Sequence, residues 1–458
     1  MSSSSAEPLT ATPPGTAAGE GHLRRVLGVP SLVLFGLVYM VPLTIFTTYG
    51  LVTQITGGRL PLAYLVTLVA MVFTARSYGL MSKAFPFAGS AYTYTQRSFG
   101  PGIGFLAGWA LLLDYLFLPM INYLVIGIYL NAAFPAMPAW TFVLATIILV
   151  TVLNIVGIVS VARANILIIA VQTIFIVVFV AMAIGVIGGA GAVDPLAPFT
   201  GTGENGGFLP IAAGAAVLCL SFLGFDSVST LAEETRDPRK NLPKAIMIVT
   251  ILAGVIFVGL AYIGHLVLPS HLFTDVDSAA LDVMAKAGGS FLVTFFTAAY
   301  VAGAAGSALA SQASVSRILF AMGRDGVLPK RFFGKINVRF GTPVLAILAV
   351  SAVSLIALVI DLGLLAEMIS FGALIAFSAV NLSVIKHYFI GQHLRGRRHL
   401  FSYLFVPAIG FALTIWLWTS LSPRTLLVGL IWLGVGLAYL AWITRGFRRP
   451  VPMLDLKE

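Results

Sequence analysis

The sequence has little of what a soluble enzyme or a disulfide-bonded secreted domain needs. Only 10% of its 458 residues are charged, 59% are hydrophobic, and the mean hydropathy is +0.99. Cys219 is the only cysteine, so an intrachain disulfide is excluded. A chain this apolar falls outside the soluble globular class and is typical of proteins with many membrane-spanning helices. The composition therefore predicts an all-α integral membrane protein.

Motifs of other protein classes are also missing. The chain has no HExxH zinc motif, no GxSxG nucleophile elbow and no P-loop, which argues against a membrane-embedded enzyme. It has no repeated filter segment of the kind that channels use. Residues 1–22 are rich in Ser, Ala, Pro and Thr without a basic start before an apolar run, so they are interpreted as a disordered tail and not as a signal peptide.

What the chain does have is a series of apolar runs close to the roughly 20 residues that span a bilayer. Twelve are predicted, at residues 31–55, 61–83, 101–132, 139–157, 164–189, 208–232, 243–268, 290–322, 343–362, 364–389, 401–421 and 425–444. We therefore expect twelve transmembrane helices.

The positive charges are distributed unevenly between the connecting segments. If both termini are cytoplasmic, all but three of the 27 Lys and Arg residues lie on the cytoplasmic side, and the exceptions are Arg59, Lys286 and Arg424. Cytoplasmic loops of membrane proteins carry such an excess. The net charge of +10 is thus explained by membrane topology, and a nucleic-acid partner is not expected.

Two of the predicted spans are interrupted by polar and helix-breaking residues. In the first, Pro42 removes a backbone donor, and the hydroxyls of Thr44, Thr47 and Thr48 offer polar replacements. In the sixth, the stretch Ser221–Ser227 contains a glycine and a carboxylate. Irregular backbone at membrane depth is tolerated where it lines a cavity, and breaks at corresponding positions of two halves point to a central binding site. The alternative is two unrelated kinks in packed helices.

Three stretches resemble the conserved blocks of amino acid-polyamine-organocation permeases: FPFAGSAYTYTQRSFGPGIGFLAGW from Phe85, SFLGFDSVSTLAEETRDPRKNLPKAI from Ser221, and ASVSRILFAMGRDGVLPKRF from Ala313. Together with LLDYLFLPMIN from Leu112, the first break looks most like that of the bacterial putrescine importers. The resemblance implies a five-plus-five inverted repeat with discontinuous helices 1 and 6 and two extra C-terminal helices. It also implies proton-driven uptake of a small amine through a bacterial inner membrane, with no cofactor. The alternative is a neutral or cationic amino-acid permease.

The expected domains follow from this fold. They are a first repeat at 23–190, a second repeat at 205–390, helices 11 and 12 at 400–445, and a cytoplasmic tail at 446–458.

The first break departs from the amino-acid branch of this superfamily. That branch typically has a Gly-rich motif whose backbone N–H groups hold the substrate carboxylate. This chain has Pro42, which has no N–H, followed by the bulky Leu43. The change favours a substrate without a carboxylate. The putrescine importers tend to have an acid slightly further along, where this chain has Thr47 and Thr48.

Carboxylates in the apolar runs are the next candidates, because a charge at bilayer depth is costly and is usually functional. Asp226 is predicted to be the counter-ion of an ammonium group or the proton-coupling carboxylate, and the alternative is a capping residue at the break. Asp114 is the second candidate for proton coupling. Eight residues separate Asp114 from Asn122, so the two share a helix face, and the aromatic ring of Tyr115 could hold an ammonium group.

The remaining candidates lie on or near the sixth and eighth spans. Ser221 is predicted to contact substrate, and Phe222 and Phe225 are candidate lids for which plain packing is the alternative. Glu233 and Glu234, amid basic residues, are expected in an inner gate. The serine pair of the eighth span, Ser307 and Ser311, indicates close helix packing more than sodium binding, and no metal site is expected.

Overall fold

The computed structural model describes residues 25–449, apart from 88–89, 157–160, 190–193, 202–206, 274, 325, 327, 338 and 447. Within this part of the chain the regular structure is helical, with one isolated parallel bridge between Leu27 and Thr235. The helices are α1 (Val29–Met40), η1 (Pro42–Phe46), α2 (Tyr49–Ile55), α3 (Leu60–Ala84), α4 (Ser90–Phe99), α5 (Pro101–Ala133), α6 (Ala139–Val156), α7 (Val161–Gly189), α8 (Ala197–Thr200), α9 (Leu209–Leu218), η2 (Cys219–Phe222), η3 (Ser227–Glu234), α10 (Pro238–Val267), α11 (Ala279–Arg324), α12 (Lys330–Phe333), α13 (Val344–Ser354), η4 (Leu355–Leu358), α14 (Leu362–Val384), η5 (Ile385–Gly391), α15 (Arg397–Leu400), η6 (Phe401–Phe405), α16 (Val406–Thr419) and α17 (Pro423–Ile443).

The expectation of an all-helical, multi-pass membrane protein is confirmed. Eleven helical stretches of the described chain are long and apolar enough to cross a membrane. The span predicted at 343–362 is shorter: the helix covers only Val344–Leu358, about 22 Å at 1.5 Å per residue, against a hydrocarbon core of roughly 30 Å. The next helix, α14, begins after Asp361, whose side chain caps it by accepting a hydrogen bond of 2.7 Å from Leu364 N–H.

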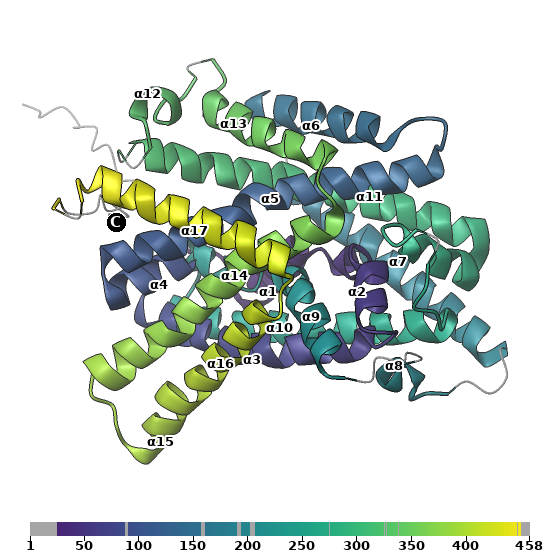
Figure 1. Ribbon diagram of the computed structural model, residues 1–458, viewed down its shortest axis with the longest axis horizontal. Coiled ribbons are helices and arrows are strands. Elements are labelled where there is room, and N and C mark those ends of the chain that lie inside the picture. Colours follow the sequence, from purple (N-terminus) through teal and green to yellow (C-terminus); the bar gives the residue numbers. More distant parts are fainter. Residues whose placement is uncertain are drawn as a thin grey trace, which may run out of the picture.

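The long helices run mostly along the length of the molecule, as Figure 1 shows, and pack in pairs from distant parts of the sequence. Helix α3 packs on α10, and α5 packs on both α11 and α14. The C-terminal α17 lies on α5, where Trp109 and Trp432 stack with ring centres 5.0 Å apart. Each indole N–H donates to the backbone carbonyl of the other tryptophan at 3.0 Å. The tail predicted at 1–22, and residues 450–458 of the tail predicted at 446–458, lie outside the described residues.

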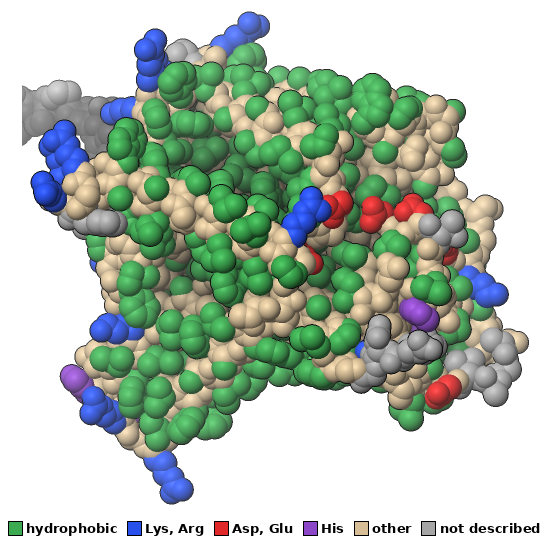
Figure 2. Space-filling model, in the orientation of Figure 1, with side chains coloured by type: hydrophobic (Ala, Val, Ile, Leu, Met, Phe, Trp, Pro, Cys, Tyr) green, Lys and Arg blue, Asp and Glu red, His purple; other side chains and the backbone are tan. Residues whose placement is uncertain are grey.

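The charged side chains gather at opposite ends of the molecule. Figure 2 shows Lys and Arg mainly at the end that carries α4, α12 and α15, whereas Asp and Glu cluster toward the other end. Between the two ends the surface is dominated by hydrophobic side chains, as expected for a belt in contact with lipid.

Both predicted interruptions are present in the backbone. Helix α1 stops at Met40, and Val41 has a φ of 52°, which is an outlier for a β-branched residue. The sixth span changes from α9 to η2, becomes extended at Leu223, and passes through Gly224 with a φ of 136°. The two breaks touch, because a Cβ built on Gly224 would lie 3.1 Å from the backbone nitrogen of Met40.

Candidate functional site

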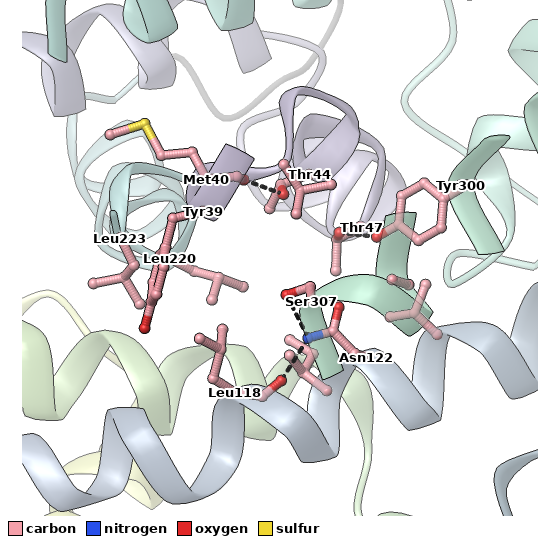
Figure 3. Close-up of a pocket in the computed structure, with 14 residues that line it drawn as sticks. Tyr39, Met40, Thr44, Thr47, Leu118, Asn122, Leu220, Leu223, Tyr300 and Ser307 are labelled. Atoms are coloured by element: carbon pink, nitrogen blue, oxygen red, sulfur yellow. Dashed lines mark hydrogen bonds between the residues drawn. The ribbon is translucent and has the colours of Figure 1, made fainter. Parts of the chain in front are cut away.

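The two breaks enclose one wall of a small cavity in the centre of the molecule. The cavity volume is about 30 Å³, which is room for about two water-sized molecules. Side chains of α5 and α11 form the opposite wall, as Figure 3 shows. The lining residues are Tyr39, Met40, Val41, Thr44, Thr47, Leu118, Ile121, Asn122, Val125, Leu220, Leu223, Tyr300, Ala304 and Ser307. None of them carries a positive charge, and most are apolar.

Hydroxyl groups line the side of the cavity formed by the first break. The Thr47 hydroxyl and the Tyr300 hydroxyl form a hydrogen bond across the cavity edge, linking η1 to α11 (Figure 3). The Thr44 hydroxyl donates to Met40 O at 2.6 Å, which satisfies a carbonyl that the broken helix leaves free. Thr44 and Thr47, both predicted from the sequence, thus lie at the cavity.

An amide lies on the opposite wall. Asn122 Nδ2 donates to Leu118 O at 2.8 Å and to Ser307 Oγ at 3.1 Å, joining α5 to α11 (Figure 3). Asn122 was predicted, whereas the sequence indicated only a packing role for Ser307. The serine both permits the close approach of α11 and faces the cavity.

Backbone donors are scarce at the first break. Val41 N–H already donates to Val38 O at 3.3 Å, and Thr44 N–H donates to Val41 O at 2.7 Å. Pro42, between them, has no N–H. Three of the four backbone nitrogens from 41 to 44 are therefore unable to bind a substrate carboxylate.

Two buried carboxylates lie beside the cavity but do not line it. Asp114 and Asp226 are 4% and 5% exposed, and they lie near each other. Asp226 accepts a hydrogen bond from Gly224 N–H at 3.2 Å, and Asp114 Oδ1 has no hydrogen-bond partner among the described residues. Tyr39 lines the cavity and also interacts electrostatically with both acids. Its side chain therefore connects the cavity to the acidic pair.

The other predicted substrate contacts are placed around the cavity and not in its wall. Ser221 Oγ is hydrogen-bonded to Tyr64 OH at 3.0 Å, and Phe222 packs on Phe257 with ring centres 5.4 Å apart. Phe225 packs on Phe377 at 5.1 Å. Thr48 is buried just beyond η1, and Tyr115 packs on the core from α5. These side chains could reach a substrate only after the helices move.

The predicted inner-gate acids lie where the N-terminal segment meets the end of the sixth span. Glu234 O accepts hydrogen bonds from Val26 N–H at 2.9 Å and Leu27 N–H at 3.0 Å. Glu233 is exposed. Neither glutamate forms an ion pair within the described chain, so the contact seen here is made by the backbone. Among the same residues no group of acids, histidines or cysteines could hold a metal ion.

Two tyrosines that line the cavity could not be predicted from the sequence. Tyr39 and Tyr300 are tyrosines in apolar helices, where most tyrosines pack in the core, and only their neighbours in space distinguish them. Tyr300 packs edge-on against Tyr129 at 4.9 Å, and the Tyr129 hydroxyl donates to Phe46 O at 2.7 Å. Tyr129 of α5, packed against Tyr300 of α11, thus supports the first break.

Comparison with known proteins covers almost the whole chain. A family model described as amino acid permease matches residues 31–441. The low-affinity putrescine importer PlaP of Escherichia coli K12 is 41% identical over 444 residues, which is 95% of this chain and 97% of that protein. The branched-chain amino acid permease BcaP of Bacillus subtilis is 28% identical over 92% of this chain and 93% of its own length. The methylthioribose transporter of Bacillus subtilis is 27% identical over 90% of this chain and 92% of its own length.

These relatives are transporters, and the family match spans both breaks, the cavity and the acidic pair. The resemblance noted in the sequence is therefore confirmed. The chain belongs to the amino acid permease family of the amino acid-polyamine-organocation superfamily and is a membrane transporter, not an enzyme.

Proposed function

We propose that this protein imports a small polyamine of the putrescine class into a bacterial cell by proton-coupled alternating access. The choice of substrate rests on one observation. A substrate carboxylate would need free backbone N–H groups at the first break, but Pro42 has none and those of Val41 and Thr44 already donate to carbonyl groups of the chain. A diamine has no carboxylate to place there. The 41% identity to a putrescine importer supports the same substrate class.

The cavity offers what a diamine needs. Its apolar side chains suit the methylene body, whereas the hydroxyls of Thr47 and Tyr300 and the amide of Asn122 can accept ammonium hydrogen bonds. Asp226 and Asp114 are the proposed proton-coupling pair, because an ammonium group arriving nearby favours their charged forms. At about 30 Å³ the cavity is too small for a four-carbon diamine, so substrate entry requires the breaks to separate.

The same proposal includes the membrane arrangement. We infer twelve spans in the inner membrane, arranged as a five-plus-five inverted repeat (23–190 and 205–390) followed by helices 11 and 12 (400–445), with both termini in the cytoplasm. The end with α12 and α15 is then cytoplasmic, which agrees with its excess of Lys and Arg. Glu233 and Glu234 lie at that end and are proposed as part of the inner gate.

The second candidate is a neutral or cationic amino-acid permease, which the 28% identity to a branched-chain amino acid permease favours. Uptake by the purified protein in proteoliposomes distinguishes the two. Radiolabelled putrescine is driven by an inwardly directed proton gradient and challenged with unlabelled spermidine, cadaverine, arginine or leucine. We expect cadaverine to compete and leucine not to compete. Strong competition by leucine, with labelled leucine accumulated, would establish the amino-acid alternative instead.

A further inference from the structure

The segment between α11 and α13 is an exposed, strongly basic surface that the transport site does not use. Lys330, Arg331, Lys335 and Arg339 are all exposed, and the sequence from 328 to 342 contains no acid. None of the four forms an ion pair within the described part of the chain. We call residues 328–337 and 339–342 the basic platform.

Large apolar side chains project from the same platform. Phe332 is 57% exposed, Ile336 51% and Phe340 37%, and the Arg339 guanidinium lies 5.4 Å above the Phe340 ring. The exposed apolar surface continues into α13, starting at Leu345. The four cations therefore lie at the border between the exposed apolar surface and the end of the molecule. In Figure 2, Lys and Arg side chains project from the corner that carries α12.

The platform is held in shape by hydrogen bonds. Asn337 Oδ1 accepts from Arg339 N–H at 2.9 Å and from Phe340 N–H at 3.3 Å, and Asn337 N–H donates to Thr342 O at 2.9 Å. The Thr342 hydroxyl donates to Ile155 O at the end of α6, at 2.8 Å. The four cations and their apolar neighbours thus form a prearranged surface.

We propose that the basic platform binds the headgroups of anionic phospholipids in the adjacent leaflet, with Phe332, Ile336 and Phe340 at the acyl boundary. An anionic leaflet attracts cations that lie close to its surface, and apolar side chains beside them add buried area. A soluble polyphosphate would use the cations but would leave three large apolar groups in water. The exposed apolar residues therefore favour a phosphate group that belongs to a lipid of the bilayer over a soluble one.

Native mass spectrometry of the full-length protein tests this with dioleoyl phosphatidylglycerol and, for comparison, dioleoyl phosphatidylcholine. The platform variant is Lys330→Gln, Arg331→Gln, Lys335→Gln and Arg339→Gln. The matched control removes four exposed cations from the segment that includes η5 and α15: Lys386→Gln, Arg395→Gln, Arg397→Gln and Arg398→Gln. We expect the Kd for phosphatidylglycerol to rise at least tenfold in the platform variant and less than twofold in the control. Phosphatidylcholine binding should not change.

A third variant, Phe332→Ser with Ile336→Ser, keeps every charge and should still weaken phosphatidylglycerol binding at least threefold. Circular dichroism and thermal unfolding establish that all variants fold. Wild-type affinity in the platform variant, or equal losses in the platform and control variants, overturns the proposal. If the Phe332 and Ile336 variant binds normally and inorganic tripolyphosphate binds the wild type as tightly as phosphatidylglycerol, the surface takes a soluble polyphosphate and the bilayer assignment is wrong.

Discussion

At the scale of single residues, the hydrogen bond between Tyr300 and Thr47 is the polar contact that joins α11 to the first break. Tyr300→Phe removes it, and such a bond contributes about 0.5–1.5 kcal/mol. We expect the KM for putrescine to rise about two- to tenfold in proteoliposome uptake. Tyr388→Phe is the control, because it removes a hydroxyl bonded to Leu80 O at 3.0 Å, away from the cavity lining. Equal effects in both variants would contradict the role of Tyr300.

Replacing Asp226 tests proton coupling separately from substrate binding. Asp226→Asn keeps an oxygen that can accept the Gly224 N–H but removes the titratable charge. We expect accumulation driven by a pH gradient to fall at least about tenfold, whereas exchange of labelled for unlabelled putrescine continues. The control is Asp282→Asn, which neutralises an exposed carboxylate near the start of α11. If Asp226→Asn accumulates substrate with unchanged pH dependence, Asp226 serves only to tie the broken helix.

Part of the site could be predicted from single residues. Asp114 and Asp226 are conspicuous because a carboxylate in an apolar run is costly, and threonines near a proline mark a break. That Asp226 bonds its own break was only the alternative in the sequence, and nothing there indicated that Tyr39 lines the cavity in its place. That depends on how α1 crosses the sixth span, which periodicity does not encode.

At the scale of elements, the contact between the two breaks depends on Gly224. A side chain there is strained at a φ of 136°, and its Cβ would lie 2.8 Å from Met40 Cγ. Strained backbone of this kind costs about 1–3 kcal/mol. We expect Gly224→Ala to lower the Tm and to reduce putrescine uptake at least about fivefold. Gly185→Ala in α7 is the control, because a Cβ built there meets no atom within 4 Å. The same Tm for both variants would contradict the packing argument.

A membrane span could be predicted wherever the helix is as long as its apolar run, as at α3 and α5. The run at 343–362 is longer than the helix found there, because its apolar residues continue past Leu358. Leu358 is followed by a turn, and the next helix, α14, begins after its N-cap Asp361. Capping geometry is a weaker signal in sequence than a long apolar run.

At the scale of the whole molecule, the acidic end lies near the approach to the cavity. Asp275 and Asp277 interact electrostatically with Tyr129, whose ring packs on the cavity residue Tyr300. Burial, and then the nearby carboxylates of Asp275 and Asp361, raise the pKa of Asp277. A surface of one sign attracts an oppositely charged substrate, and the effect falls with ionic strength.

We therefore expect Asp275→Asn with Asp277→Asn to raise the KM for the putrescine dication about threefold at low salt, with little difference in about 0.5 M NaCl. Because the pKa of Asp277 is raised, its charge is lost at a higher pH than that of an unperturbed aspartate, so wild-type and variant KM values should converge toward acidic pH. Initial uptake rates measured over a salt series and a pH series check both effects. A difference that persists at high salt would indicate a local structural change instead of long-range attraction.

The stacked tryptophans of α5 and α17 have an optical consequence. Two indoles whose ring centres lie 5.0 Å apart, with planes 21° from parallel, couple their strong far-ultraviolet transitions, which adds an exciton contribution to the circular dichroism that a single tryptophan does not have. Because Trp109 and Trp432 come from helices more than 300 positions apart in the chain, that signal exists only while α17 remains docked on α5. The transporter thus carries a label-free spectroscopic reporter of its C-terminal helix, readable in detergent or liposomes during a transport cycle.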